Sequence, residues 1–371
     1  MGPTRTPDPP FRAPAAGLAL LALVVAGAGC TGGSRDSVRE MRTASAVPMA
    51  GHSALRIETR SADVHLIQSP DDTLRVVTTR RVQAGSERTV ESILSQIKVT
   101  MEPQGDVLVL RVREPERGRT RVRGSAGPWR HRRSVEVELT IAVPARVRVD
   151  GETMSGDFDA VGMAQALSLV ATSGDIDMSQ LSGPARAQTT SGDVTLRDLG
   201  QGATVKVTAG DVDAVEVRGP LMMRATSGDL SAQQAHGGVR LETSTGEIEV
   251  HGVEGTVMAS TSAGDVDVSA AAADSCVVET ASGDIAIALV RPSRHLEVRS
   301  SSGAVTLRLP PGAGGALDLQ TASGAIQVKS AIEVEVMNRN RLSGRLGGSG
   351  AIAVRTSSGD ITLATSEGVT P

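Results

Sequence analysis

Aspartates recur at one position of a repeated Ser-Gly-Asp tripeptide, and carboxylates at a regular spacing could bind cations. They follow glycines that lie mostly 18 residues apart and form the column Asp157, Asp175, Asp193, Asp211, Asp229, Asp265 and Asp284. If the repeats stack, neighbouring carboxylates lie about 5 Å apart and repel one another unless a cation or a hydrogen-bond donor lies between them. Two hypotheses stay open. One is a ladder of calcium sites, and the other is that each Asp accepts backbone N–H bonds in its own turn. The turn is favoured, because calcium-binding nonapeptide repeats have acidic residues at both corners of the coil and here only one corner has them.

The same carboxylates are weak candidates for catalysis. Paired Asp and Glu perform acid–base chemistry in glycosidases. Here a second acidic residue often follows two places after the first, as Asp177 follows Asp175, but this pairing repeats from coil to coil and no coil has residues that set it apart as a catalytic site. The six His have no metal-ligand spacing, and the chain contains no nucleophile elbow and no phosphate-binding loop. We therefore expect no enzyme, no metal site and no cofactor, with calcium as the one ion left open.

One segment departs from the repeat and is strongly basic. Residues 111–133 contain nine Arg against two Glu, together with the only Trp of the chain. The planar guanidinium group suits phosphate, so this segment could bind an anionic envelope polymer or a lipid headgroup. The alternative is a solvated insertion loop. The arginines of this candidate patch are Arg117, Arg119, Arg121, Arg123, Arg130, Arg132 and Arg133. With a formal net charge of -4 and almost no aromatic residues, the chain offers nothing to suggest a nucleic-acid partner.

The third candidate is Cys30, which closes an N-terminal apolar run. The small pair Ala28-Gly29 directly before Cys30 resembles the bacterial lipobox, whose Cys is lipidated and becomes the mature N-terminus, although Gly27 stands where that motif usually has Leu. We expect residues 1–29 to be a signal peptide and residues 30–50 a flexible tether. The protein would then be exported and lipid-anchored in the cell envelope, at the outer membrane if the host has two. The alternative is an ordinary secretory signal with an incidental Cys.

The elements that position these residues follow from the glycines. Seven repeat glycines from Gly156 to Gly264 are spaced by 18 residues, and apolar residues stand two and four places after most of them. This alternation predicts an all-β fold, a parallel β-solenoid with 18-residue coils that each give one strand to each of two facing sheets. Residues 151–371 would be regular repeats. Residues 51–150 would be irregular first coils with insertions and one helix near 87–97. A rolled antiparallel β-sandwich is the alternative, because Ser-Gly-Asp can also form hairpin turns.

Two further segments support a family resemblance. These are Val137–Pro144, which leads into the repeats, and Gly347–Ile361, which closes them. With the Ser-Gly-Asp repeats they resemble the bacterial “putative adhesin” family of β-strand-repeat proteins, a domain of unknown function, over roughly residues 50–365. The resemblance implies an exported β-solenoid without known catalytic residues. We expect a non-enzymatic envelope lipoprotein that acts as a scaffold or binding rod. A calcium-stabilised β-roll is the alternative, and a polysaccharide-acting β-helix enzyme is a remote one.

Overall fold

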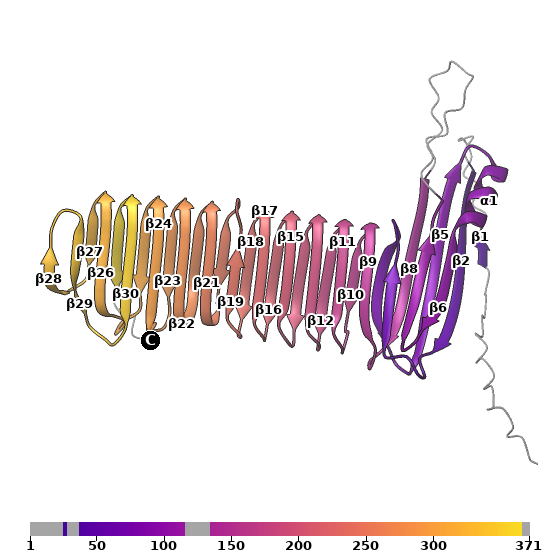
Figure 1. Ribbon diagram of the computed structural model, residues 1–371, viewed down its shortest axis with the longest axis horizontal. Helices are drawn as coiled ribbons and strands as arrows, with labels where there is room; N and C mark the ends of the chain where they lie inside the picture. Colours follow the sequence, from indigo (N-terminus) through magenta and orange to yellow (C-terminus); the bar gives the residue numbers. More distant parts are fainter. Residues whose placement is uncertain (1–24, 28–36, 116–133, 366–371) are drawn as a thin grey trace, which may run out of the picture.

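The computed structural model describes residues 25–27, 37–115 and 134–365, which form a long rod of stacked β-strands (Figure 1). The strands pair in two sheets, A and B, which face one another along the rod, and the chain alternates between them. Strands of the regular repeats pair in parallel with the strand one coil away, so that Ile176 lies opposite Val194 and Val194 opposite Val212. The predicted all-β parallel solenoid is confirmed. Among the described strands, antiparallel pairs occur only toward the two ends of the rod.

Each regular coil contributes one strand to each sheet. The strands of sheet A follow the repeat glycines: β10 (Phe158–Val161), β12 (Ile176–Leu181), β14 (Val194–Leu199), β16 (Val212–Val217), β18 (Leu230–Ala235), β20 (Ile248–His251), β23 (Ile285–Leu289) and β25 (Val305–Leu309). The strands of sheet B precede the glycines: β9 (Arg148–Ser155), β11 (Leu167–Ser173), β13 (Ala185–Ser191), β15 (Ala203–Ala209), β17 (Leu221–Ser227), β19 (Val239–Glu242), β21 (Glu254–Ala263) and β24 (His295–Ser302). Strand β22 (Val266–Ser282) continues from sheet A into sheet B.

The core is the narrow layer between the sheets, filled by alternate residues of every strand. Val212, Leu196 and Val205 are fully buried, while Thr204 next to Val205 points outward. Cys276 lies in one of these inward columns as a buried free cysteine, and burial raises the pKa of its thiol to about 12. The predicted inward and outward positions are therefore confirmed in the regular coils. This register also keeps the acidic residues outside.

The repeat glycines are required at the corner where sheet B passes into sheet A. At Gly174, φ is +150°, and a Cβ there would lie 2.2 Å from the carbonyl oxygen of Gly156 in the preceding coil. No side chain fits so close to a backbone oxygen, so stacking at this corner demands glycine in coil after coil. This steric demand accounts for the glycine period in the sequence.

The N-terminal end of the rod is broader and mixed in strand direction. Its elements are β1 (Val25–Gly27), β2 (Ser37–Pro48), β3 (Ala54–Glu58), β4 (Asp63–Ser69), β5 (Thr73–Ala84), α1 (Glu87–Gln96), β6 (Lys98–Gln104), β7 (Val107–Arg113) and β8 (Ser134–Pro144). Helix α1 begins at the cap Ser86, whose side chain accepts the Thr89 amide, and it buries Val90 and Leu94. The helix packs against β5 and β2 at this end of the rod (Figure 1).

Residues 37–48 do not form the expected tether. They make strand β2, which pairs antiparallel with β5 over its whole length, and β1 pairs with β2 in turn. The reason is that β5 spans 12 residues and uses only one of its edges to pair with β8. Its other edge offers a long row of backbone partners to β2. Polar residues of β2 are compatible with this edge, and Arg39 pairs with Glu91 of α1 at 2.8 Å. A polar composition was therefore a misleading sign of a tether.

Coils do not stack in chain order at either end. The coil of β3 and β4 lies between the coil of β7 and β8 and the coil of β9 and β10. At the other end the elements are β26 (Gly315–Ser323), β27 (Ile326–Lys329), β28 (Glu333–Met337), β29 (Arg341–Leu346), β30 (Ala351–Ser358) and β31 (Ile361–Thr365). Here the last coil, β30 and β31, lies between β24–β25 and β26–β27. Beyond β26, sheet B continues with β29 and β28.

Candidate functional site

The acidic column forms a ladder of hydrogen bonds between coils. Oδ1 of Asp157 accepts the amide N–H of Asp175 at 2.9 Å, and Oδ1 of Asp211 accepts that of Asp229 at 2.8 Å. A backbone amide of a neighbouring coil donates in the same way to Oδ1 of Asp63, Asp175, Asp193, Asp229, Asp265, Asp284 and Asp360. The aspartates thus accept backbone N–H bonds as expected, but the donor belongs to the next coil and not to their own turn.

Glu247 is the acidic residue that departs from this ladder. Its amide donates to Asp229 at 2.8 Å, but no bond from the Asp265 amide to its longer side chain is present in the described part of the chain. Burial raises the pKa of Glu247, and the charges of Glu249 and Asp265 raise it further. Among the described residues no group of three or more His, Cys, Asp or Glu is placed to hold a metal ion. Calcium binding stays the less favoured alternative, to be tested in solution.

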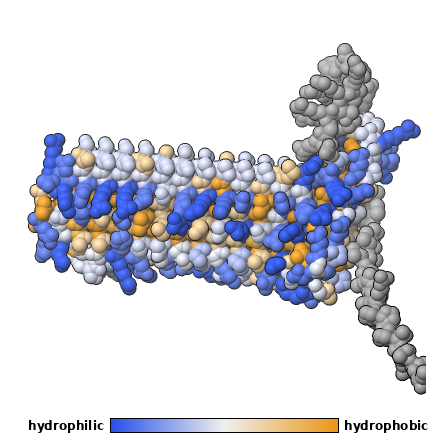
Figure 2. Space-filling model, viewed as in Figure 1, coloured by the Kyte–Doolittle hydropathy of each residue, from blue (hydrophilic) through white to orange (hydrophobic). Residues whose placement is uncertain are grey.

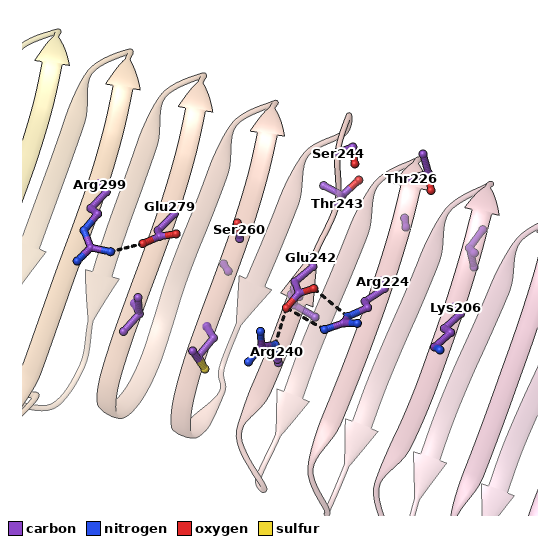
Figure 3. A pocket seen from close by; sticks show the side chains of 16 residues that line it. Lys206, Arg224, Thr226, Arg240, Glu242, Thr243, Ser244, Ser260, Glu279 and Arg299 are labelled. Atoms are coloured by element: carbon purple, nitrogen blue, oxygen red, sulfur yellow. Dashed lines mark hydrogen bonds and ion pairs between the residues drawn. The ribbon is translucent and has the colours of Figure 1, made fainter.

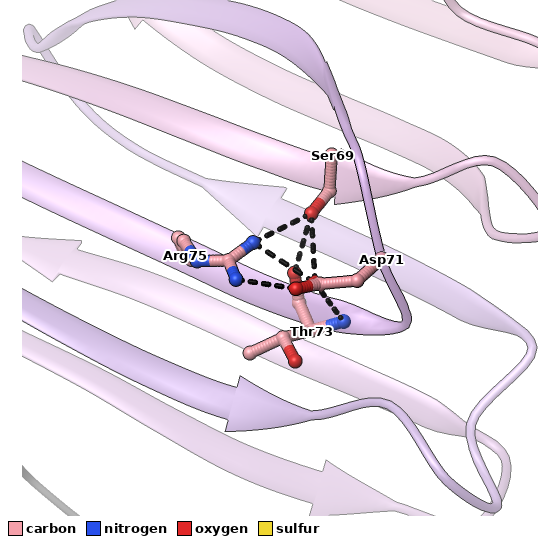
Figure 4. Close-up of polar contacts among 4 residues, drawn as sticks. All are labelled: Ser69, Asp71, Thr73 and Arg75. Carbon is pink, nitrogen blue, oxygen red and sulfur yellow. Dashed lines mark hydrogen bonds and ion pairs between the residues drawn. The ribbon is translucent and has the colours of Figure 1, made fainter.

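A second polar cluster closes the connection between β4 and β5 (Figure 4). Arg75 donates to Asp71 at 2.5 Å and to Ser69 at 2.9 Å, and Asp71 also accepts the Thr73 amide at 3.0 Å. The hydrogen bond from Arg75 is the main cause that lowers the pKa of Asp71 to about 2. Ser69 also donates to the Thr73 carbonyl at 2.9 Å, so three side chains and the Thr73 backbone satisfy one another between residues 69 and 75. We interpret the cluster as a structural turn.

Two of the sequence-predicted sites lie outside the described residues. These are Cys30 and the arginine patch, of which Arg117, Arg123 and Arg133 are members. Within the described ranges, no helix has the length and apolar character needed to cross a membrane. Lipidation and binding by the arginine patch therefore stay predictions.

A groove on the outer face of sheet B is the candidate binding site, and sequence reasoning missed it (Figure 3). It is a shallow hollow of about 790 Å³, and a second hollow of about 450 Å³ adjoins it through shared lining residues. The groove forms because a column of mostly long side chains, which crosses seven strands of sheet B, contains one short residue. In order along the rod, that column contains Lys206, Arg224, Glu242, Ser260, Glu279, Arg299 and Arg355. Ser260 is short, so the sheet is hollow between Glu242 and Glu279.

Arginines and glutamates hold the two walls of the groove in place. On one side, Glu242 accepts Nε of Arg224 at 2.8 Å and Nε of Arg240 at 2.5 Å. On the other, Glu279 accepts Nη1 of Arg299 at 2.5 Å. Lys206 has no ion pair within the described residues. The floor between the walls contains Met258, Ala259 and Val277.

The groove and its rim have an excess of positive charge. Five cations line the two hollows, Lys206, Arg224, Arg240, Arg299 and Arg355, against the carboxylates of Glu242 and Glu279. Glu297 and Asp318 lie beside it and pair with Arg299 and Arg355. The outer face of sheet A is acidic instead, with Asp159, Asp177, Asp213, Glu249 and Asp267 in one column interrupted by Thr195 and Ser231. The space-filling view shows rows of polar side chains beside an apolar band along the rod (Figure 2).

The groove could have been found by following the outward columns and not the inward ones. Position by position, Lys206, Arg224 and Glu242 are 18 residues apart, and Ser260 is the first short residue in that series. Two carboxylates, Glu242 and Glu279, flank the hollow. Because arginines already engage both, neither is placed as the proton donor that glycoside cleavage requires.

Comparison with solved structures gives distant likenesses. A “putative cell adhesion protein” of Clostridium sporogenes is 8% identical, covers 88% of this chain and 99% of its own, and has a TM-score of 0.24. A “putative adhesin” of Bacteroides fragilis is 13% identical over 66% of this chain and 97% of its own, with a TM-score of 0.32. A “putative lipid binding protein” of Parabacteroides distasonis is 12% identical over 88% and 97%, with a TM-score of 0.29. Comparison with curated proteins gives no match.

The family model gives the firmer result, because it covers most of the chain. It matches residues 52–259 and 239–364, which together include the N-terminal strands from β3 onward, the regular coils and the interleaved C-terminal coil. The chain belongs to the Toastrack DUF4097 family, a domain of unknown function.

Proposed function

We propose that this chain is a non-enzymatic, adhesin-like binding rod of the bacterial cell envelope, exported and held at the membrane by a lipid on Cys30. The groove on sheet B carries the proposal. A stack of short parallel strands makes a rigid rod, and the groove gives that rod a binding surface along its length. The family supplies the fold and leaves the ligand open.

The ligand that fits the groove best is an anionic envelope polymer. Because strands advance by about 4.8 Å, the seven strands under the charged column give a track on the order of 30 Å long. Cations stand toward both ends of this track, and in its middle Ser260 lies between Glu242 and Glu279, which are both paired with arginines. A linear anionic chain laid along the rod would meet Arg224 and Arg240 at one end and Arg355 at the other. The acidic column on sheet A would repel the same chain, so binding is confined to one face.

Binding to a simple acidic polysaccharide tests this proposal. We expect the full chain with Cys30→Ser to bind immobilised polygalacturonate and not neutral dextran, with an affinity that falls as salt rises. Ser260→Glu fills the groove and adds a negative charge, so it should lower the affinity at least about tenfold, a loss of about 1.4 kcal/mol. The control is Ser179→Glu, the same change on sheet A beside Arg197. Equal binding of both variants, or equal binding of neutral dextran, would contradict the groove as the site.

Membrane fractionation tests the anchor separately. If Cys30 carries the lipid, Cys30→Ser should move the protein from the membrane fraction to the soluble fraction. Unchanged partition would remove the lipoprotein part of the proposal and leave the groove untouched.

A further inference from the structure

The two ends of the rod differ in how they are closed. At the N-terminal end, helix α1 covers strands β2 and β5 and buries Val90 and Leu94. At the other end sheet A stops at β27, whereas sheet B continues for two more strands, β29 and β28 (Figure 1). Sheet B therefore overhangs sheet A. Solenoids need caps with a polar outer face, and this end has none in the described part of the chain.

The overhang exposes side chains on the core side of sheet B. Val334 lies opposite Gly344, and Met337 lies opposite Leu342, a residue of the core. Leu342 is only 4% exposed, but Val334 is 50% and Met337 70% exposed. The difference arises because no strand of sheet A lies over β28. Ile326 and Val328 of β27 and the connecting Ile332 are only partly buried at the same end. We call the exposed or partly buried apolar residues at this end the apolar tip: Ile326, Val328, Ile332, Val334 and Met337.

Both sheets also end in free strand edges at this tip. Among the described strands, β27 pairs only with β31, and β28 pairs only with β29. The outward backbone groups of β28 are therefore available to another strand. Glu333 and Glu335 alternate with the valines of β28 and take part in no ion pair within the described residues. The edge is open but selective, because a strand that placed acidic residues opposite these glutamates would be repelled.

We propose that the tip binds a second copy of this chain, so that two rods join end to end. A two-fold axis between Glu335 and Val336 pairs β28 antiparallel with its counterpart. It places Val334 of one copy opposite Met337 of the other, and the bulge at Glu335 keeps both on the core side. The same register places Glu333 opposite Asn338 and next to Arg339, so no glutamate faces a glutamate. The edge is thus complementary to itself.

The symmetry of this contact limits the assembly to two rods. A two-fold contact uses the same surface on both copies, so it closes at the dimer and does not propagate into a filament. The contact consists of one strand edge and the few apolar side chains of the tip, so we expect it to fall below the standard size of about 1,600 Å² for stable complexes. Association in solution should therefore be weak. Many rods on facing surfaces would strengthen it by multivalency.

A role of this dimer in joining two surfaces rests on one part of the proposed function, the lipid anchor at Cys30. If Cys30 holds the N-terminal side at a membrane, the apolar tip lies at the far end of the rod. Two envelopes that both carry the protein would then be joined by identical tips. The dimer itself does not depend on the anchor or on the groove.

Sedimentation velocity of the full chain with Cys30→Ser tests the dimer. Over about 5 to 300 µM, the range in which interfaces of this size associate, the weight-average mass should rise toward that of two chains. Val334→Lys together with Met337→Lys should keep the protein monomeric throughout. Both side chains are exposed in the monomer, so the variant should fold, and its thermal melt and circular dichroism should match those of the unsubstituted chain. The matched control is Val290→Lys, a valine that is 55% exposed away from the tip, and it should dimerise normally.

Three outcomes would overturn the proposal. These are a monomer at every concentration, a tip variant that dimerises as the unsubstituted chain does, and a Val290→Lys variant that loses dimerisation as fully as the tip variant. Beads coated with the protein through its N-terminal side then test adhesion between surfaces. The unsubstituted chain should clump the beads and the tip variant should not. Ser260→Glu should clump them normally, which separates failure of the tip from failure of the groove.

Discussion

Replacement of Asp211 tests whether the aspartate ladder strengthens the rod by hydrogen bonding or weakens it by repulsion. Oδ1 of Asp211 accepts the Asp229 amide at 2.8 Å. A hydrogen bond to a charged group contributes about 1.5–3 kcal/mol, and an exposed one lies toward the lower value. From the spacing of neighbouring strands, the carboxylates of Asp193 and Asp229 lie about 5 Å away on either side. Each repels Asp211 by about 0.4 kcal/mol in water at physiological salt.

Two substitutions separate these effects. Asp211→Ala removes both, so it should lower the free energy of unfolding by about 0.5–1 kcal/mol. Asp211→Asn keeps an acceptor in place and removes only the charge, so the free energy of unfolding should stay within about 0.5 kcal/mol of the original. Urea unfolding measures the difference. Amide hydrogen exchange at Asp229 reports the bond itself and should speed up in the alanine variant only.

Salt dependence provides a further check. At about 1 M salt the Debye length falls to about 3 Å, so the repulsion disappears and the unsubstituted chain should gain stability relative to Asp211→Asn. Equal effects of alanine and asparagine, or unchanged exchange of the Asp229 amide in Asp211→Ala, would refute the view that the ladder bonds stabilise the stack.

Three further predictions follow from register, charge and the engaged carboxylates. Val212→Asp buries a carboxylate between the sheets and should cost several kcal/mol in urea unfolding, whereas the outward Thr204→Asp should cost well under about 1 kcal/mol; similar losses would contradict the register. The raised pKa of Glu247 means that its ionisation opposes folding, so its stabilising contribution is present below its ordinary value of 4.5 and is lost as pH rises through the raised value. Glu247→Gln should thus be more stable than the original at pH 7, and the difference should vanish in acid melts. Calcium at about 1 mM should leave the melting temperature nearly unchanged, because the ladder already engages Oδ1; a rise above about 10 °C relative to chelator would support a cation ladder.

The regular coils were predictable because each corner imposes the same steric demand. Gly174 and its equivalents fix the coil length, and alternation after them fixes which side of each strand is buried. The order of the coils was not predictable, because every coil presents the same register to its neighbours. Gly359 matches Gly303 and Gly324 equally well, and it lies between them.

The left-handed backbone at the second corner of the coil was not predicted, although the corner itself was. Gln180, Asp198, Glu216 and Gln234 have φ between +52° and +59°, a region that favours glycine. The signal was present, since Gly162 and Gly252 occupy the same column of the repeat, but it is sparse compared with the first corner. The groove was missed for a related reason. It arises where one short side chain, Ser260, interrupts a column of long ones, and the repeat pattern shows what the coils share and not where one of them differs.

The interleaved last coil changes how the rod can come apart. In a simple stack the terminal coil has one neighbour and can peel away strand by strand. Here β30 and β31 contact coils on both sides, so tension on the C-terminal end must shear two interfaces at once before any coil is released. The same arrangement delays assembly, because β26 and β27 reach the rod only through a coil that follows them in the chain. Such long-range contacts form late and slowly. This end should therefore be the last part of the rod to fold and among the most resistant to mechanical unravelling.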